Sequence, residues 1–243
     1  MDLSPFSRVA GLRRQPVLYA IVPIALSIFI TLEGIEGTGK STQSTRLAKR
    51  LRTEGYDCLL TREPGGTVIG RDIRQVILSP ENHHMCAETE LGLYFSDRAQ
   101  HLREVIWPAL EAGRIVVSDR FTDSTLAYQG YGRRLPLRLV RSLDRIMTGG
   151  FRPNVTLLLD LTVTEGLRRA RRRNKQSPAH SREGRFEEEE LAFHERVRRG
   201  YAMMVRREPE RFVTVSALGT AAEVHEALWT ALKKTGKLPR KKR

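Results

Sequence analysis

A glycine-rich octapeptide near the N-terminus constrains the fold of this chain more than any other feature. Residues 34–41 read Gly-Ile-Glu-Gly-Thr-Gly-Lys-Ser, which fits the pattern G-x-x-x-x-G-K-[ST]. An apolar run, Ser27–Glu33, precedes the octapeptide, and a helical pattern that begins at Lys40 follows it. Glycines let the backbone turn so that its N–H groups face one point, where the helix dipole adds positive potential. The pattern predicts a strand, a phosphate-binding loop and a helix.

Every residue of this loop is a candidate contact for a nucleoside triphosphate. The candidates are Gly34, Ile35, Glu36, Gly37, Thr38, Gly39, Lys40, Ser41 and Thr42. Lys40 should reach the β- and γ-phosphates of ATP, and the Ser41 hydroxyl should bind Mg²⁺. Asp119 ends an apolar run at the edge of the sheet where ligands bind, so it should be the second metal ligand. The loop alone indicates an NTPase or a kinase and leaves the acceptor open.

Short apolar runs alternate with longer amphipathic segments along the rest of the chain. This order predicts an α/β fold, a P-loop NTPase-like three-layer sandwich with a five-stranded parallel sheet and a lid segment. The expected strands are Ser27–Glu33, Asp57–Thr61, Ile115–Asp119, Val155–Leu161 and Phe212–Ser216. The expected helices are Lys40–Arg52, Gly70–Leu78, Glu88–Glu111, Leu137–Met147, Val163–Asn174, Glu187–Arg207 and Ala221–Lys233.

The length of 243 residues suits one sizeable domain, which we expect over residues 27–232. Residues 1–26 are expected to be a dispensable extension. Their apolar stretch is interrupted by Pro23 and is followed by no small-residue cleavage site, so it does not fit a signal peptide or a membrane span. Two cysteines, Cys58 and Cys86, cannot form a disulfide framework and fit a reducing compartment.

The net charge of +14 is concentrated in a few segments. Residues 166–185 carry +7, residues 233–243 carry +7 and residues 1–26 carry +2, so the remainder is close to neutral. A nucleic-acid-binding protein more often spreads its basic residues over one folded face. We therefore expect no nucleic-acid partner, and we expect residues 233–243 to be a disordered basic tail.

Three further segments carry candidate residues for binding a phosphoryl acceptor. They are Thr61–Gly66, Phe95–Gln100 and Asp119–Gly130. Arg62 and Arg120 follow strand ends, and arginine binds a monophosphate through two hydrogen bonds. Phe95 and Arg98 lie three residues apart on one helix face, as an aromatic ring and a donor that read a base would. Taken singly, such a phenylalanine is usually a core residue and such an arginine usually forms a surface ion pair.

The chain resembles the thymidylate kinase family in four motifs and in their order. They are the phosphate loop, Thr-Arg-Glu-Pro-Gly-Gly, Phe-Ser-Asp-Arg and Asp-Arg-Phe-Thr-Asp-Ser-Thr-Leu-Ala-Tyr-Gln-Gly. The resemblance runs from Ser27 to about Trp229. It implies transfer of the γ-phosphoryl group of ATP to dTMP, with Mg²⁺, in dTTP synthesis for DNA replication. It also implies a cytoplasmic homodimer with residues 88–111 at the interface, small-molecule substrates and no membrane association.

The resemblance implies a role for each matching residue. Phe95 would stack on thymine and Arg98 would bond its carbonyl, while Arg62 and Arg120 would hold the dTMP phosphate. Glu36 would contact the sugar 3′-hydroxyl or the metal. The nucleoside pocket would be completed by Thr125, Tyr128 and Gln129.

The basic segment at about 168–187 resembles the lid that closes over ATP in this family. Some members carry an arginine directly after the loop glutamate, where this chain has Gly37. The chain therefore resembles the branch whose lid supplies the catalytic arginine. Arg185 matches best and would act with Lys40 and Arg120. The other candidates are Arg172, Arg173 and Arg182.

Two other functions remain open from the sequence. One is a kinase for another acceptor, such as dUMP or a deoxynucleoside. The other is a catalytically silent protein that binds nucleotide or associates with a membrane through its N-terminus. The intact set of Lys40, Ser41 and Asp119 argues against a silent protein.

Overall fold

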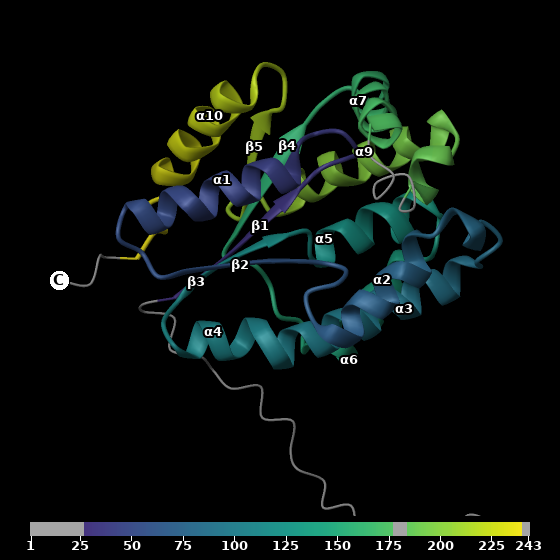
Figure 1. Ribbon diagram of the computed structural model, residues 1–243. Coiled ribbons are helices and arrows are strands. Elements are labelled where there is room, and N and C mark those ends of the chain that lie inside the picture. The colour runs from purple at the N-terminus through teal and green to yellow at the C-terminus, as the bar shows by residue number, and fades with distance from the viewer. Residues whose placement is uncertain (1–26, 177–183, 240–243) are drawn as a thin grey trace, which may run out of the picture.

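A five-stranded parallel sheet forms the centre of the computed structural model, which describes residues 27–176 and 184–239 (Figure 1). The strands lie in the order β2-β3-β1-β4-β5, and every neighbouring pair is parallel. Their bounds are β1 (Ile28–Glu33), β2 (Cys58–Arg62), β3 (Ile115–Asp119), β4 (Val155–Asp160) and β5 (Phe212–Ser216). The predicted fold class is confirmed, and each predicted strand is found with its ends shifted by no more than one residue.

Helices cover both faces of the sheet. On one face lie α1 (Lys40–Thr53) and α10 (Ala221–Lys234), which also contact each other (Figure 1). The other helices are α2 (Val68–Leu78), α3 (Ala87–His101), α4 (Trp107–Glu111), α5 (Thr122–Thr125), α6 (Leu137–Thr148), α7 (Val163–Gln176) and α9 (Leu191–Arg207). Short 3₁₀ or π turns are η1 (Pro80–Asn82), η2 (Leu102–Ile106), η3 (Leu126–Gly132) and η4 (Arg185–Glu188).

Strand β1 shows why the sequence builds a three-layer sandwich. Its side chains alternate between the two faces, as the period of a strand requires. Ile30 and Leu32 pack against the α1 and α10 side, whereas Phe29 packs against a separate cluster that includes Leu102 and Phe121. All are fully buried, so a strand with apolar residues on both faces is covered on both faces.

The predicted helix Glu88–Glu111 differs from the structure in its middle. The helical path is α3, then the π turn η2, then α4. Pro108 lies in the first turn of α4, and its ring would clash with the carbonyl group of Glu104 in a regular α-helix. The π turn lies at this point and lets the helical path continue past the proline.

Three other expectations about helices differ from the structure. α2 begins at Val68, because the Thr67 side chain accepts a hydrogen bond from the backbone N–H of Gly70 and caps the helix. The helix predicted from Glu187 begins at Leu191, after η4. The helical turns α5 and η3 were not predicted.

The basic tail departs from the expected disorder over its first part. Residues 233 and 234 complete α10, and Lys237 donates hydrogen bonds to the carbonyl oxygens of Asn154 and Glu210. Leu238 packs against the core on the α1 and α10 side, which explains why the chain stays on the domain. Residues 1–26, 177–183 and 240–243 lie outside the described residues, so the expectations for the N-terminal extension, for Arg182 and for the end of the tail are not tested. No helix among the described residues is long and apolar enough to cross a membrane.

Candidate active site

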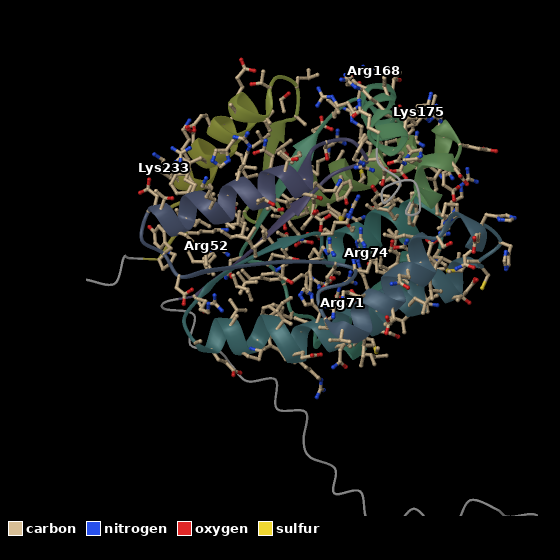
Figure 2. All side chains as sticks on the ribbon, in the orientation of Figure 1. Arg52, Arg71, Arg74, Arg168, Lys175 and Lys233 are labelled. Atoms are coloured by element: carbon tan, nitrogen blue, oxygen red, sulfur yellow. The ribbon has the colours of Figure 1, made fainter. Side chains whose placement is uncertain are left out.

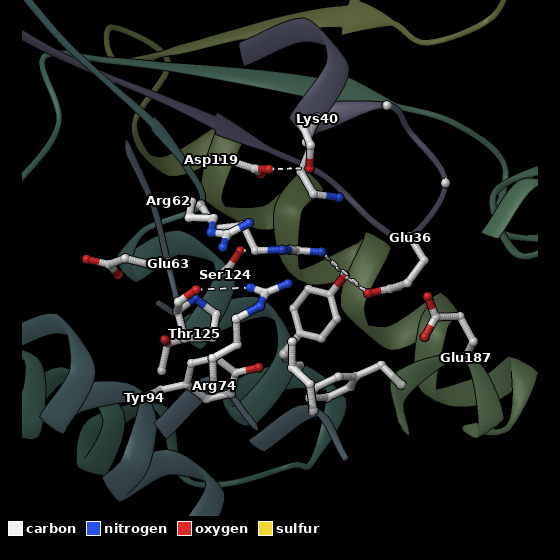
Figure 3. Close-up of a pocket in the computed structure, with 18 of the residues that line it drawn as sticks. Glu36, Lys40, Arg62, Glu63, Arg74, Tyr94, Asp119, Ser124, Thr125 and Glu187 are labelled. Atoms are coloured by element: carbon white, nitrogen blue, oxygen red, sulfur yellow. Dashed lines mark hydrogen bonds and ion pairs between the residues drawn. The ribbon is translucent and has the colours of Figure 1, made fainter. Parts of the chain in front are cut away.

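The carboxyl ends of three neighbouring strands bring the phosphate loop, Arg62 and Asp119 to one edge of the sheet. In the β2–β3 pairing Arg62 lies opposite Asp119, and in the β1–β3 pairing Leu32 lies opposite Asp119. The loop leaves β1 directly after Glu33, so it begins beside both residues. Figure 3 shows Lys40, Asp119 and Arg62 directed toward the same space. The strand order therefore places the site at the carboxyl ends of the strands, which is where parallel α/β sheets usually bind ligands.

A cavity of about 570 Å³ opens at this edge. That volume is in the range of a nucleotide-sized ligand pocket. The predicted site residues that line it are Glu36, Gly37, Gly39, Lys40, Ser41, Thr42, Arg62, Asp119, Arg120, Thr125, Tyr128 and Gln129. The predicted residues outside its lining are Gly34, Ile35, Thr38, Phe95, Arg98 and Arg185.

Lys40 is folded back over its own loop. Its ammonium group donates to the carbonyl oxygen of Ile35 at 2.7 Å and to the hydroxyl of Thr38 at 3.4 Å. Burial and the charge of Arg120 lower the pKa of Lys40 to about 7, against the opposing effect of Glu36 and other carboxylates. A bound triphosphate would favour the charged form, because an anion beside an ammonium group raises its pKa.

The hydroxyl of Ser41 and the carboxylate of Asp119 face each other. Ser41 Oγ donates to Asp119 Oδ2 at 2.5 Å. Two oxygen ligands on adjacent elements fit Mg²⁺, which takes its remaining ligands from water and substrate phosphates. Among residues 27–176 and 184–239, no group of three or more His, Cys, Asp or Glu side chains could hold a metal.

Arg120 connects the phosphate loop to the other half of the cavity. Its guanidinium donates to the carbonyl oxygen of Gly34 at 3.2 Å, to Ser124 Oγ at 2.9 Å and to the hydroxyl of Tyr128 at 3.2 Å. Its backbone has φ of 76°, a left-handed conformation that is rare for a residue with a side chain. Such strain is often found at functional sites. The backbone N–H of Arg120 bonds the carbonyl oxygen of Leu32 at 3.0 Å, which fixes this turn at the end of β1.

Glu36 is a buried and ionised carboxylate on the cavity wall. Burial alone would raise its pKa, but the hydrogen bond with His194 and the charges of Arg120 and Lys40 outweigh burial and lower the pKa to about 2. Tyr128 donates to Glu36 Oε1 at 2.5 Å, and His194 Nδ1 lies 3.2 Å from Oε2. His194 is not among the site residues predicted from the sequence.

On α3, the aromatic residue that lines the cavity is Tyr94, one position before the predicted Phe95. Phe95 is 1% exposed and packs in the core with residues such as Leu91, whereas Tyr94 lines the cavity (Figure 3). Successive residues of an α-helix point about 100° apart, so a shift of one residue exchanges the cavity face for the core face. Tyr94 and Arg98 also share a face, at the spacing i and i+4. That spacing was the signal available in the sequence.

Arg98 lies behind the cavity wall. It is 1% exposed, and its Nε donates to Glu63 Oε2 at 2.8 Å. His101 Nδ1 lies 2.9 Å from the other oxygen of Glu63, which itself lines the cavity. The Nη1 atom of Arg98 is buried and has no hydrogen-bond partner among the described residues. Arg98 thus holds the Glu63 side chain from behind the cavity wall, and its Nη1 atom keeps a donor that no described residue uses.

Arg185 is held away from the cavity. It is 3% exposed, and it donates to Glu90 Oε2 and to the carbonyl oxygen of Ile77, each at 2.6 Å. Of the other candidates, Arg173 lines the cavity and pairs with Glu187 at 2.8 Å. Arg169 lines it too, whereas Arg168 and Lys175 lie on α7 at the periphery of the molecule (Figure 2). In this structure Arg185 thus contacts Glu90 and Ile77 and does not line the cavity.

The fold and this site define a P-loop phosphotransferase. A glycine-rich loop at the end of a central parallel strand, a lysine, a hydroxyl and a strand-end carboxylate face one cavity. The chain belongs to the thymidylate kinase family, since the sequence model of that family matches residues 32–228.

The chain matches two thymidylate kinases over nearly the whole length of each. The chain is 53% identical over 207 residues to the thymidylate kinase of Desulfosudis oleivorans, covering 85% of this chain and 97% of that protein. It is 51% identical over 214 residues to the thymidylate kinase of Syntrophotalea carbinolica, covering 88% of this chain and 99% of that protein. The crystal structure of thymidylate kinase from Ehrlichia chaffeensis superimposes with a TM-score of 0.67 at 30% identity, covering 85% and 98% of the two chains.

Proposed function

We propose that this chain transfers the γ-phosphoryl group of ATP to dTMP and releases ADP and dTDP. One observation carries the proposal: the phosphate loop and an arginine-rich acceptor pocket open into the same cavity. Phosphoryl transfer needs the two phosphates in line and their charge neutralised, and a shared cavity provides both. Membership of the thymidylate kinase family supports dTMP as the acceptor.

At the donor end, the loop N–H groups and Lys40 bind the triphosphate of ATP. Ser41 and Asp119 would hold Mg²⁺, which neutralises charge on the phosphates when it is bound. Lys40 has to leave the carbonyl oxygen of Ile35 to reach a phosphate, and the carbonyl is a weaker partner than an anion.

At the acceptor end, Arg62 and Arg120 bind the dTMP phosphate. Both line the cavity at the ends of neighbouring strands, and Arg120 also touches the phosphate loop through the carbonyl oxygen of Gly34. Arg74 lines the same region and donates to the carbonyl oxygen of Pro64 at 3.0 Å, so it lies beside the loop that carries Arg62 (Figure 3). No strong general base is required, because the attacking phosphate oxygen is already ionised.

The nucleoside end of the cavity offers a matching set of groups. Tyr94 presents an aromatic face for the thymine ring, a role we transfer to it from Phe95. Thr125 Oγ1 is buried on the cavity wall with no partner among the described residues, so it suits a polar atom of the base. Gln129 donates to Glu90 at 2.7 Å, which fixes the orientation of its amide. Glu36, ionised and able only to accept hydrogen bonds, suits the single free hydroxyl of the deoxyribose, the 3′-hydroxyl.

The lid side of the cavity supplies further positive charge. Arg169 and Arg173 lie on α7 one helical turn apart and both line the cavity. We assign the catalytic arginine to Arg173, because its guanidinium pairs with Glu187 at the cavity, and a phosphate is an equivalent anionic partner for that guanidinium. Arg185 instead holds the lid base to Glu90.

The decisive experiment is an acceptor panel. Release of ADP is followed with dTMP, dUMP, dCMP, dGMP and thymidine as acceptors, with ATP and Mg²⁺ in excess. We expect the highest kcat/KM with dTMP and no turnover of thymidine, because Arg62 and Arg120 select a phosphate. Equal rates with dTMP, dCMP and dGMP would refute the assignment of the acceptor. A rate with dUMP equal to that with dTMP would support the dUMP alternative.

We further propose that the protein acts as a cytoplasmic homodimer. Exposed apolar side chains lie on the two helices that pack on α3: Val68, Ile69 and Val76 on α2, and Leu139 and Ile146 on α6. Residues 69 and 76, like residues 139 and 146, are two helical turns apart and share a face. A second copy is the proposed occupant of this surface. Both cysteines are free, which fits a reducing compartment.

Light scattering after size-exclusion chromatography tests the dimer. The mass should be twice 27.7 kDa for the wild type. Ile146→Lys should give the monomer mass, because it places a charge in the apolar surface. The matched control is Leu218→Lys, which changes a similarly exposed apolar residue remote from α2 and α6. A wild-type monomer, or a dimer in both variants, would refute the proposed interface.

A further inference from the structure

His194 lies near the start of α9, the helix that follows the lid and η4. The imidazole is 1% exposed, and its Nδ1 atom lies 3.2 Å from Glu36 Oε2. The two residues are 158 positions apart in the chain, so the contact joins the lid-side helix to the phosphate loop. Its Nε2 atom is buried and has no hydrogen-bond partner among the described residues. Among the described residues, Glu36 is thus the one polar partner of the His194 ring.

The direction of this hydrogen bond follows from the state of Glu36. Its pKa is lowered to about 2, against the effect of burial, so the carboxylate is ionised at neutral pH and can only accept. His194 therefore donates through Nδ1–H.

The two oxygens of Glu36 have different neighbours. Oε1 accepts from the hydroxyl of Tyr128 at 2.5 Å and lies 3.5 Å from an Arg120 nitrogen. Oε2 accepts from His194, its one donor among the described residues. A carboxylate oxygen accepts two hydrogen bonds, so Oε2 keeps one site for a ligand in the cavity that Glu36 lines.

Close packing fixes α9, and therefore the imidazole. A Cβ atom placed on Gly132 of η3 would lie 2.7 Å from the Phe193 ring, and one placed on Gly200 of α9 would lie 2.7 Å from the Tyr131 ring. These contacts leave no room for α9 to slide along η3. Two turns after His194, the hydroxyl of Tyr201 donates to Glu33 at 2.8 Å, so α9 is bound to the end of β1 as well.

We propose that His194 is a positioning residue for the acceptor nucleotide: its Nδ1–H holds the Glu36 carboxylate so that Oε2 receives the 3′-hydroxyl of the deoxyribose. The proposal rests on the assignment of dTMP as acceptor. It differs from a purely structural role, because a core histidine would affect every ligand equally. The lost hydroxyl contact would affect only an acceptor that has a 3′-hydroxyl.

Three variants separate the donor from the shape of the side chain. His194→Leu removes the donor. His194→Asn places an amide nitrogen at the same number of bonds from Cα as Nδ1, so it keeps the donor to Glu36. His194→Gln places its amide at the position of Nε2 and stands in for the leucine variant if that variant does not fold. The matched control is Val197→Ala, a fully buried core substitution on the same helix face.

The readout is the dissociation constant, measured by calorimetry, of dTMP and of 2′,3′-dideoxythymidine 5′-monophosphate, which lacks the 3′-hydroxyl. Wild type should bind dTMP about tenfold or more tightly than the dideoxy nucleotide, as a hydrogen bond to a charged group predicts. His194→Leu should weaken dTMP binding by about tenfold and change dideoxy binding by less than about threefold. His194→Asn should stay within about threefold of wild type for both nucleotides. Val197→Ala should change both by the same factor.

Each result decides one of the two proposals. Failure of the wild type to bind dTMP would refute the proposed function itself. Normal binding of dTMP with no preference over the dideoxy nucleotide would refute the role of Glu36, and with it that of His194. An equal loss for both nucleotides in His194→Leu, no loss in that variant, or a loss in His194→Asn as large as in His194→Leu would refute the role of His194 alone.

Discussion

Gly37 of the phosphate loop and Gly166 of α7 are in backbone contact. A Cβ atom on Gly37 would lie 2.0 Å from the carbonyl oxygen of Gly166, and one on Gly166 would lie 2.5 Å from the carbonyl oxygen of Glu36. Gly37 also has φ of 71°, which favours glycine. The loop therefore has no room for a side chain at position 37. An arginine that joins Lys40 at the transferred group therefore has to come from another segment, and α7 places Arg169 and Arg173 on the cavity wall.

The contact between these two glycines predicts the effect of Gly166→Ala. The added methyl group has to push α7 away from the loop, so Arg173 moves from the cavity while the core of the domain stays intact. We expect kcat to fall by about tenfold or more, as small misplacements of catalytic groups do. Gly92→Ala in α3 is the control, because its Cβ meets nothing within 4 Å and its activity should be unchanged. Unchanged kcat in Gly166→Ala, measured by release of ADP, would show that the close approach has no role in catalysis.

Lys40 predicts opposite effects on activity and on stability. Removal of the amine in Lys40→Met should lower kcat by about a hundredfold or more, as loss of one transition-state donor does. Lys49→Met, at an exposed position on the same helix, should retain activity. Wild-type turnover in Lys40→Met would show that the donor site lies elsewhere.

The pH dependence of stability gives an independent test of Lys40. Its pKa falls from 10.5 in the unfolded chain to about 7 in the ligand-free protein, because of burial first and of Arg120 second. Between these values the unfolded chain binds a proton that the folded protein does not, so this residue makes stability rise with pH from about 7 to 10.5. Thermal unfolding without ATP should therefore show Lys40→Met to be more stable than wild type near pH 7, with a smaller difference near pH 10. A difference that is independent of pH would contradict the depressed pKa.

Tyr94 and Phe95 predict a reversal of roles between adjacent residues. Tyr94→Ala should raise the KM for dTMP by about tenfold or more and leave the KM for ATP unchanged, because stacking on a base contributes about 1–3 kcal/mol. Phe95→Ala should instead lower the free energy of unfolding by about 3–5 kcal/mol, as loss of a buried aromatic side chain does. Urea unfolding and steady-state kinetics on both variants check this. A larger effect of Phe95→Ala than of Tyr94→Ala on the KM for dTMP would restore the assignment made from the sequence.

The sequence predicted what depends on local pattern and on the geometry of parallel sheets. The strands, the phosphate loop and the placement of Arg62 and Asp119 at the ligand-binding edge of the sheet follow from apolar runs and from strand ends, whereas the pairing of Arg62 with Asp119 depends on the strand order. The rotation of α3 about its axis was not predicted, because it depends on which face of the helix packs on the core, and Tyr94 and Phe95 are both plausible aromatic contacts until that face is known. Contacts between residues far apart in the chain also escaped. Glu90 is 95 residues from Arg185 and Glu36 is 158 residues from His194, and no spacing in one sequence reveals such pairs.

Arg173 and Arg185 give the last prediction, which separates a catalytic arginine from a structural one. Arg173 is 46% exposed in its side chain and faces the cavity, so Arg173→Ala should lower kcat by about a hundredfold or more with little change in stability. Arg185→Ala should leave the fully buried Glu90 with a weaker set of partners and lower the free energy of unfolding by about 3–5 kcal/mol, with kcat reduced far less.

Arg172→Ala is the matched control for both arginines, since its side chain is exposed on α7 and lines no part of this cavity. It should change neither kcat nor the thermal midpoint. If Arg185→Ala instead abolished turnover at unchanged stability, Arg185 would have to leave Glu90 and enter the cavity when ATP binds. That result would make the ion pair of Arg185 and Glu90 the contact that breaks when the lid closes. The effect of Glu90→Gln on stability would then differ between the ATP-bound and the ATP-free protein.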